Sequence, residues 1–103
     1  MISPTTKAAI AESTLQRPVH ASNTASRVYG ADAVIITPDE GMVRMLNPTA
    51  SRIWQLVDGS RSAEDIAVVL TEEYDVDFQQ AWQAVNTMLN ELSEKRLIDW
   101  VAL

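Results

Sequence analysis

The stretch GMVRMLNPT, residues 41–49, carries a short apolar segment directly into the start of a helix. Four of the five residues from 42 to 46 are apolar, which leaves too little polar surface for a strand with one face in water. Asn47 is a good N-cap residue, and Pro48 stands at the first helical position, where its missing N–H costs nothing. The stretch therefore predicts an edge strand that needs a cover and ends at a helix.

Two more strands are predicted before this one. SRVYGADAVIIT, residues 26–37, has two short β-branched and aromatic runs on either side of a Gly-Ala-Asp turn, which is typical of a hairpin. PDEG, residues 38–41, predicts a second turn, with proline setting φ and glycine free to take a positive φ. The three strands form an antiparallel meander in which residues 42–46 are the third strand.

Three helices are predicted after residue 46. The first is expected to end at Asp58-Gly59, and the second begins at Ser62, which with Asp65 resembles a capping box. The third begins at Asp77, with Gln80 in the equivalent place. The helices present apolar stripes of Ala50, Ile53, Trp54 and Val57, then Ile66, Val69, Leu70 and Tyr74, then Phe78, Ala81, Trp82, Val85, Met88, Leu89 and Leu92. The predicted fold is α+β and winged-helix-like, a three-stranded antiparallel β-meander followed by three α-helices.

Composition limits the organisation of the chain. Residues 1–24 are rich in Ser, Thr and Ala without a sustained period, which predicts a flexible N-terminal tail before a single domain over residues 25–103. An apolar tail at residues 97–101 should fold back onto the core. No apolar run approaches the ~18 residues of a membrane span, and the first 20 residues lack a signal core. We expect a soluble cytoplasmic protein without a membrane partner.

Several kinds of chemistry are disfavoured by the residues present. The 103 residues contain no cysteine and a single histidine, His20, so we expect neither a metal nor another cofactor. The carboxylate pairs Glu64-Asp65 and Glu72-Glu73 are neighbours in sequence and do not converge on one point of a helix. The formal net charge is −6, whereas nucleic-acid binding requires clustered Lys and Arg. We therefore expect no catalysis and no nucleic-acid partner.

A longer stretch resembles a known family. LNPTASRIWQLVDGSRSAEDIAVVLTEEYDV, residues 46–76, followed by MLNELSEKRLI, residues 88–98, is similar to the PqqD family, small peptide chaperones named after pyrroloquinoline quinone biosynthesis. The resemblance runs from about residue 27 to residue 100, and it lies in the ordered combination of motifs. One departure is Arg96, which stands where the family usually has glycine and should affect only a helix cap.

The resemblance implies a function and a site. Members bind the leader of a ribosomally made precursor peptide and present its core to a modifying enzyme, commonly a radical S-adenosylmethionine enzyme. The leader docks as an added strand on the third strand, and its side chains enter a groove between that strand and the third helix. Carried onto this chain, the implied peptide-binding residues are Met42, Val43, Arg44, Met45 and Leu46 of the strand and Trp82, Val85, Asn86 and Leu89 of the helix.

Some of these residues keep two interpretations. Met42, Met45 and Met88 suit a surface that accommodates varied ligands, but methionine also fills ordinary cores. Arg44 either pairs with an acidic leader residue or is a solvated charge that protects the edge from aggregation. Trp82 is either the core anchor of the third helix or the floor of the groove. Strand alternation leaves open which of residues 42–45 faces the groove, since a bulge near residue 41 would invert it.

The predicted function is a non-enzymatic peptide-binding chaperone for the leader of a ribosomally synthesised precursor. Its expected partners are that leader and a modifying enzyme such as a radical SAM protein, with the chain itself a monomer or a weak homodimer. Two alternatives from other classes are a winged-helix DNA-binding regulator, which the element order allows, and a self-associating structural adaptor.

Overall fold

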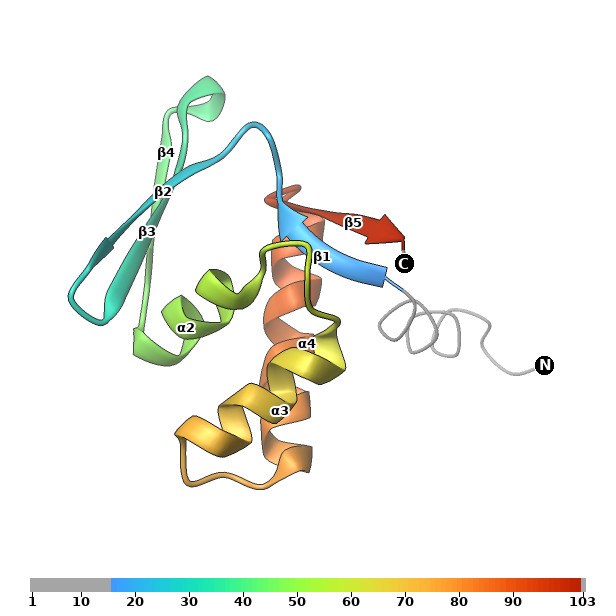
Figure 1. Cartoon of the computed structure of the whole chain (residues 1–103). Coiled ribbons are helices and arrows are strands. Elements are labelled where there is room, and N and C mark those ends of the chain that lie inside the picture. The colour runs from blue at the N-terminus through green and yellow to red at the C-terminus, as the bar shows by residue number, and fades with distance from the viewer. Residues whose placement is uncertain (1–15, 103) are drawn as a thin grey trace.

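A computed structural model describes residues 16–102, which form two antiparallel sheets and three α-helices (Figure 1). One sheet has the order β2-β3-β4 and the other pairs β1 with β5. The elements are β1 (Gln16–His20), β2 (Ala25–Tyr29), β3 (Asp32–Thr37), the short 3₁₀ turn η1 (Pro38–Glu40), β4 (Met42–Leu46), α2 (Pro48–Leu56), α3 (Ala63–Glu73), α4 (Phe78–Glu94) and β5 (Ile98–Ala102). The predicted α+β class, with a three-stranded antiparallel sheet and three helices, is confirmed.

The helix starts form as their sequences predict. The Asn47 side chain accepts a hydrogen bond from the Ala50 N–H at 2.8 Å. Reciprocal capping boxes open the other two helices, with Ser62 and Asp65 at α3 and Asp77 and Gln80 at α4. The end of α2 differs from the prediction, because this helix ends at Leu56 and Asp58 instead forms a β-bridge with Val19 of β1. Local side-chain hydrogen bonds thus define the starts more reliably than the ends.

The predicted flexible tail is wrong for residues 16–24. The β1 strand pairs with β5 from Gln16 opposite Ala102 to His20 opposite Ile98. Its second side is held by the α2–α3 loop, where the Gly59 N–H donates to the Pro18 carbonyl at 2.9 Å. The reason is long-range pairing, since the partner strand lies at the other end of the chain and no local period reveals it. Residues 1–15 of the predicted tail lie outside the described residues.

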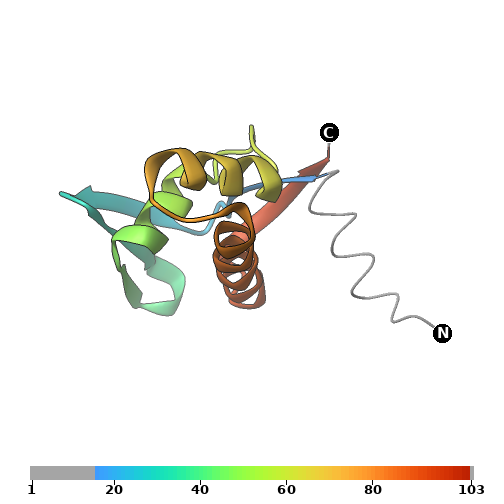
Figure 2. The ribbon, with the colours of Figure 1, turned by 90° about the horizontal axis from the view of Figure 1, so that it is seen from below.

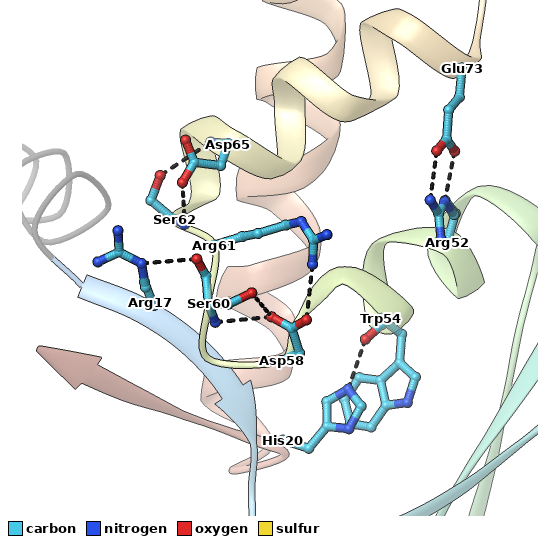
Figure 3. A network of polar contacts seen from close by, with 10 residues as sticks. All are labelled: Arg17, His20, Arg52, Trp54, Asp58, Ser60, Arg61, Ser62, Asp65 and Glu73. Atoms are coloured by element: carbon cyan, nitrogen blue, oxygen red, sulfur yellow. Dashed lines mark hydrogen bonds and ion pairs between the residues drawn. The ribbon is translucent and has the colours of Figure 1, made fainter. Parts of the chain in front are cut away.

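A stacked aromatic pair holds β1 on the core. The His20 ring lies parallel to the indole of Trp54, with centroids 3.6 Å apart and planes 6° apart (Figure 3). The His20 Nε2 is 2.7 Å from the Trp54 carbonyl oxygen, and since a carbonyl only accepts, this nitrogen carries the proton. Trp54 is 1% exposed, so its predicted place in the core is confirmed.

The core lies among the three helices and the inner face of β3. Figure 2 shows the three-stranded sheet and the β1–β5 pair on opposite sides of α4. The α2 helix contacts β3, and α3 packs against α4. The fully buried residues of the core are chiefly aliphatic and include Ala33, Ile35, Ile53, Val57, Ile66, Val85, Leu89 and Leu97. Leu97 and Ile98 confirm that the apolar end of the chain folds back onto the core.

Two exposed polar clusters brace the helices from outside (Figure 3). Arg52 of α2 makes a bidentate pair with Glu73 of α3, at 2.7 Å from Nε and 2.6 Å from Nη2. This hydrogen-bonded guanidinium holds the pKa of the Glu73 carboxyl below its usual value. Hydrogen bonds from Ser60, with a nearby Arg61, lower the pKa of Asp58 in the α2–α3 loop. Both carboxylates are therefore charged at neutral pH.

A buried serine joins the sheet to α2. Ser51 is 0% exposed, and its hydroxyl accepts a hydrogen bond from the Ala33 N–H at 2.6 Å. The same hydroxyl donates to the Leu46 carbonyl at 3.2 Å. Ala33 and Leu46 are direct partners across β3 and β4. The serine hydroxyl is thus inserted between the two strands and satisfies one main-chain group of each.

Replacing Ser51 with alanine is predicted to destabilise the protein by about 1–3 kcal/mol, because it leaves a buried N–H and a partly buried C=O without this partner. The free energy of unfolding in urea measures the loss. Ser93→Ala, at an exposed position of α4, serves as the control and should change stability by less than about 0.5 kcal/mol. Equal stability of the two variants would contradict the role given to the Ser51 hydroxyl.

Arg96 closes α4 in a left-handed conformation. Its φ is 59°, and it is the one non-glycine residue with positive φ within residues 16–102. The Arg96 N–H donates to the Ser93 carbonyl at 3.0 Å, and the Leu97 N–H donates to the Leu92 carbonyl at 2.9 Å. These two bonds, with buried Leu92 and Leu97 in the accompanying apolar positions, form a Schellman motif. The departure from glycine at this position therefore falls on a helix cap, as the sequence predicted.

Arg96→Gly is predicted to stabilise the chain by up to about 1 kcal/mol, because glycine adopts positive φ without the Cβ penalty. The gain is partly offset by the greater freedom of glycine in the unfolded chain. Thermal unfolding measures it, with Arg96→Ala as the control that removes the side chain but keeps the Cβ. A glycine variant no more stable than the alanine variant would show that the cap carries no strain.

Candidate peptide-binding site

The β4 strand is a free edge of its sheet. It pairs with β3 on one side, and no strand within residues 16–102 pairs with the other. The inserted Ser51 hydroxyl shows that Ala33 and Leu46 point main-chain groups toward each other. Because such groups alternate along an antiparallel ladder, the N–H and C=O of Val43 and Met45 point away from β3. Two residues therefore present main-chain groups at the edge that no strand within residues 16–102 pairs with.

The register also assigns the faces of β4. Arg44 lies opposite Ile35 and Leu46 lies opposite Ala33, and both partners are 0% exposed. Directly opposite residues share a face, so Arg44 and Leu46 point to the core side of the sheet. Val43 and Met45 are 63% and 77% exposed on the opposite face. The alternation that the sequence left open is thereby decided, with no inversion after Gly41.

A groove runs beside this edge, made of two hollows. The larger, about 470 Å³, lies between the start of α2 and α4, and the smaller, about 400 Å³, lies between β4 and the end of α4. They share Ala50, Met88 and Glu91, so they form one continuous surface. The first is lined further by Asn47, Thr49, Ile53, Gln80, Gln83, Ala84 and Thr87, and the second by Ile35, Arg44, Met45, Leu46, Leu92, Lys95 and Leu97.

The predicted strand residues reach the groove in part. Arg44, Met45 and Leu46 line the smaller hollow, whereas Met42 and Val43 line neither hollow. Met42 still borders the turn, where its carbonyl lies 3.5 Å from the Thr37 hydroxyl. Val43 contributes its outward main-chain groups rather than its side chain. Of the three methionines assigned to the groove, Met45 and Met88 line it.

The four predicted residues of α4 do not line the groove. Val85 and Leu89 are 0% and 2% exposed, so both side chains lie in the core and neither is accessible from the groove. Trp82 packs partly buried against the core and stacks on Phe78, with ring centroids 6.1 Å apart. The Asn86 side chain donates to the Trp82 carbonyl of its own helix at 2.9 Å. Trp82 and Asn86 flank the core stripe on the side away from the groove.

The groove side of α4 is a mixed stripe of which the sequence analysis named only Met88. Its members recur at helical spacing and are Gln80, Gln83, Ala84, Thr87, Met88, Glu91 and, after the helix, Lys95. The core stripe of Ala81, Val85, Leu89 and Leu92 lies beside it. Spacing alone identifies the core stripe but not which flank meets the sheet, because that depends on how α4 docks.

The lining of the groove mixes apolar and polar side chains. Its floor is aliphatic and thioether, and its rim carries amide, hydroxyl and a few charged groups. Within residues 16–102 no group of three His, Asp or Glu side chains is placed to hold a metal ion. None of the helices in this part of the chain has the length and apolar character needed to cross a membrane. The arrangement is suited to binding an extended chain with varied side chains.

The fold and groove define a class, a small α+β domain with a side-chain groove beside a free sheet edge. The sequence model described as coenzyme PQQ synthesis protein D (PqqD) matches residues 32–98, and the chain belongs to this PqqD family. A comparison with curated proteins finds no match.

Two solved structures share the fold. One is described as TbiB1 in complex with the TbiA(beta) leader peptide, with a TM-score of 0.73 and 23% identity over 79% of this chain and 94% of that chain. The other is lasso peptide synthetase B1 complexed with the leader peptide, with a TM-score of 0.73 and 23% identity over 81% of this chain and 98% of that one.

Proposed function

We propose that this chain is a recognition element for the leader of a ribosomally synthesised precursor peptide. The leader pairs in extended form with the β4 edge and places side chains in the groove between β4, α2 and α4. The observation that carries the proposal is the meeting of outward main-chain groups at Val43 and Met45 with a continuous hollow surface. Family membership and the two leader-bound relatives of the same fold support it.

The energetics require both halves of this site. A main-chain hydrogen bond contributes only about 0.5–1.5 kcal/mol net, so the few bonds available at Val43 and Met45 do not hold a peptide alone. Burial of apolar surface adds roughly 25 cal/mol per Å², and the groove offers Ile53, Ala84 and Met88 for it. Strand pairing therefore sets the register of the peptide, and the groove supplies most of the affinity.

The role that follows is presentation rather than catalysis. We infer that the bound leader is delivered to a separate modifying enzyme, such as a radical SAM protein, in the cytoplasm. The chain itself acts as a monomer or weak homodimer and as no enzyme. The DNA-binding alternative has no support in the groove, whose lining contains two cations and one carboxylate rather than a basic patch.

A displayed library of peptides with about 12 randomised residues, longer than the roughly five needed to span β4, provides ligands for a direct test. For peptides selected on the full chain, Val43→Pro should weaken binding at least about tenfold, because it removes one outward N–H at the edge. Fluorescence anisotropy of the labelled peptides measures the affinity.

The matched control is Val43→Ala, which shortens the exposed side chain but keeps the N–H, and which should leave affinity within about threefold. Circular dichroism and thermal unfolding check that both variants fold. Peptides that bind the folded proline variant as tightly as the wild type do not use main-chain pairing at β4, and the proposal would then fail.

The selected peptides are also predicted to perturb a defined set of amide signals in an NMR titration. Residues 42–46 and the stripe of Gln83, Thr87 and Glu91 should shift, whereas the opposite flank at Trp82 and Asn86 should shift less. Perturbations confined to α3, or to residues 1–24, would contradict the groove assignment.

A further inference from the structure

One end of the groove carries two cations. Arg44 reaches it from the inner face of β4, and Lys95, the residue directly after α4, reaches it from the other side. Both line the smaller hollow beside the apolar side chains of Leu46 and Met88. The opposite end, between α2 and the start of α4, is lined by amide and hydroxyl groups, and no Lys or Arg is among the described residues that line it. The groove is therefore electrostatically unequal along its length.

The guanidinium of Arg44 has donors to spare. It carries five N–H groups, yet within residues 16–102 its one hydrogen bond runs from Nη1 to the Thr37 hydroxyl at 3.4 Å. It also forms an ion pair with Oε1 of Glu40 at 3.9 Å, too long for a hydrogen bond, so none of its N–H groups is used by that carboxylate. The side chain is only 21% exposed, so a charge placed beside it is screened less than at an open surface.

The second cation, Lys95, lacks even such a loose partner, since it makes no ion pair with any residue in the range 16–102. Glu91, one helical turn earlier, lines both hollows and likewise forms no ion pair within that range. Its carboxylate disfavours a second anion in the middle of the groove. The smaller hollow thus sets two cations against one carboxylate, whereas the larger hollow has that carboxylate as its one charged lining group, so an incoming anion is favoured at the Arg44–Lys95 end.

The geometry points to selection of an acidic peptide side chain at this end, an inference that rests on the proposed function. The occupant is an extended peptide with an Asp or Glu whose carboxylate meets Arg44 and Lys95, next to an apolar side chain seated over Leu46 and Met88. A carboxylate suits the planar fork of the guanidinium, which can bind it in bidentate form. Because the whole chain carries a formal charge of −6, long-range attraction does not explain such a preference, and the two cations must supply it locally. The acidic residue would then also set the direction in which the peptide lies.

The test compares the displayed 12-residue library selected on the full wild-type chain with the same library selected on an Arg44→Gln, Lys95→Gln double variant. Wild-type binders should be enriched in Asp or Glu at one position relative to their apolar residue, and this enrichment should disappear on the variant. For individual acidic peptides, Arg44→Gln should weaken binding roughly tenfold, and Glu91→Gln should strengthen it about threefold. When the Asp or Glu of these peptides is replaced by Asn or Gln, Arg44→Gln should no longer change their affinity.

Arg27→Gln is the matched control, since Arg27 lies on β2 opposite Val34, on the outer face of the same sheet. Its binders should keep the acidic enrichment, and thermal unfolding verifies the fold of every variant. If the wild-type binders lose their affinity for the Val43→Pro variant but show no acidic enrichment, only this inference is overturned. If no selected peptide loses its affinity for the Val43→Pro variant, both the proposed function and this inference are overturned.

Two other occupants are distinguished in the same experiment. Light scattering of the wild type at the selection concentration tests whether a second copy fills the groove. A dimer that dissociates on the Lys95→Gln change would identify a second copy as the occupant, and we expect none. Binders obtained only after removal of residues 1–15 would identify that segment as the occupant. Either outcome overturns the selection of an acidic peptide side chain.

Discussion

The hydroxyl of Ser51 is the contact on which the binding surface depends. It accepts from Ala33 on β3 and donates to Leu46 on β4, although it belongs to the first turns of α2. Three elements therefore meet at one buried oxygen. Because a buried N–H or C=O is costly to leave unpaired, this contact allows little freedom to the junction of strand and helix. The position of the β4 edge relative to α2 follows from it.

That junction explains how an open edge and a groove come to lie side by side. Asn47 and Pro48 turn the chain away from the sheet immediately after Leu46, so α2 starts as a wall at the end of β4. The α4 helix, packed on α3 and extended toward β5, supplies the other wall. The outward main-chain groups of β4 therefore lie directly beside a groove with two helical walls. Side-chain caps at the starts of α3 and α4 satisfy main-chain N–H groups that the helices leave unpaired.

Much of this architecture was predictable because its signals are local. Asn47, Ser62 and Asp77 cap their helices through side chains three residues or fewer from the groups they satisfy. Gly41 takes a φ of 64° in the turn before β4, as a turn glycine should. The meander follows from short strands joined by such turns. Where the structure departs from the sequence analysis, in β1 and in the flank of α4 that borders the groove, the deciding contacts join residues far apart in the chain.

The sequence by itself determined the α+β class, the order of the three-stranded meander and the three helices, the helix starts and the family, because capping, turn chemistry and apolar periodicity act over a few residues. Tertiary structure alone decided that Arg44 and Leu46 face inward, that Val43 and Met45 offer main-chain groups outward, and that Gln83, Thr87 and Glu91 rather than Val85 and Leu89 border the groove. The physical reason is that strand register and helix docking depend on contacts between distant segments. A helical stripe in the sequence has two flanks, and only packing against the sheet chooses between them.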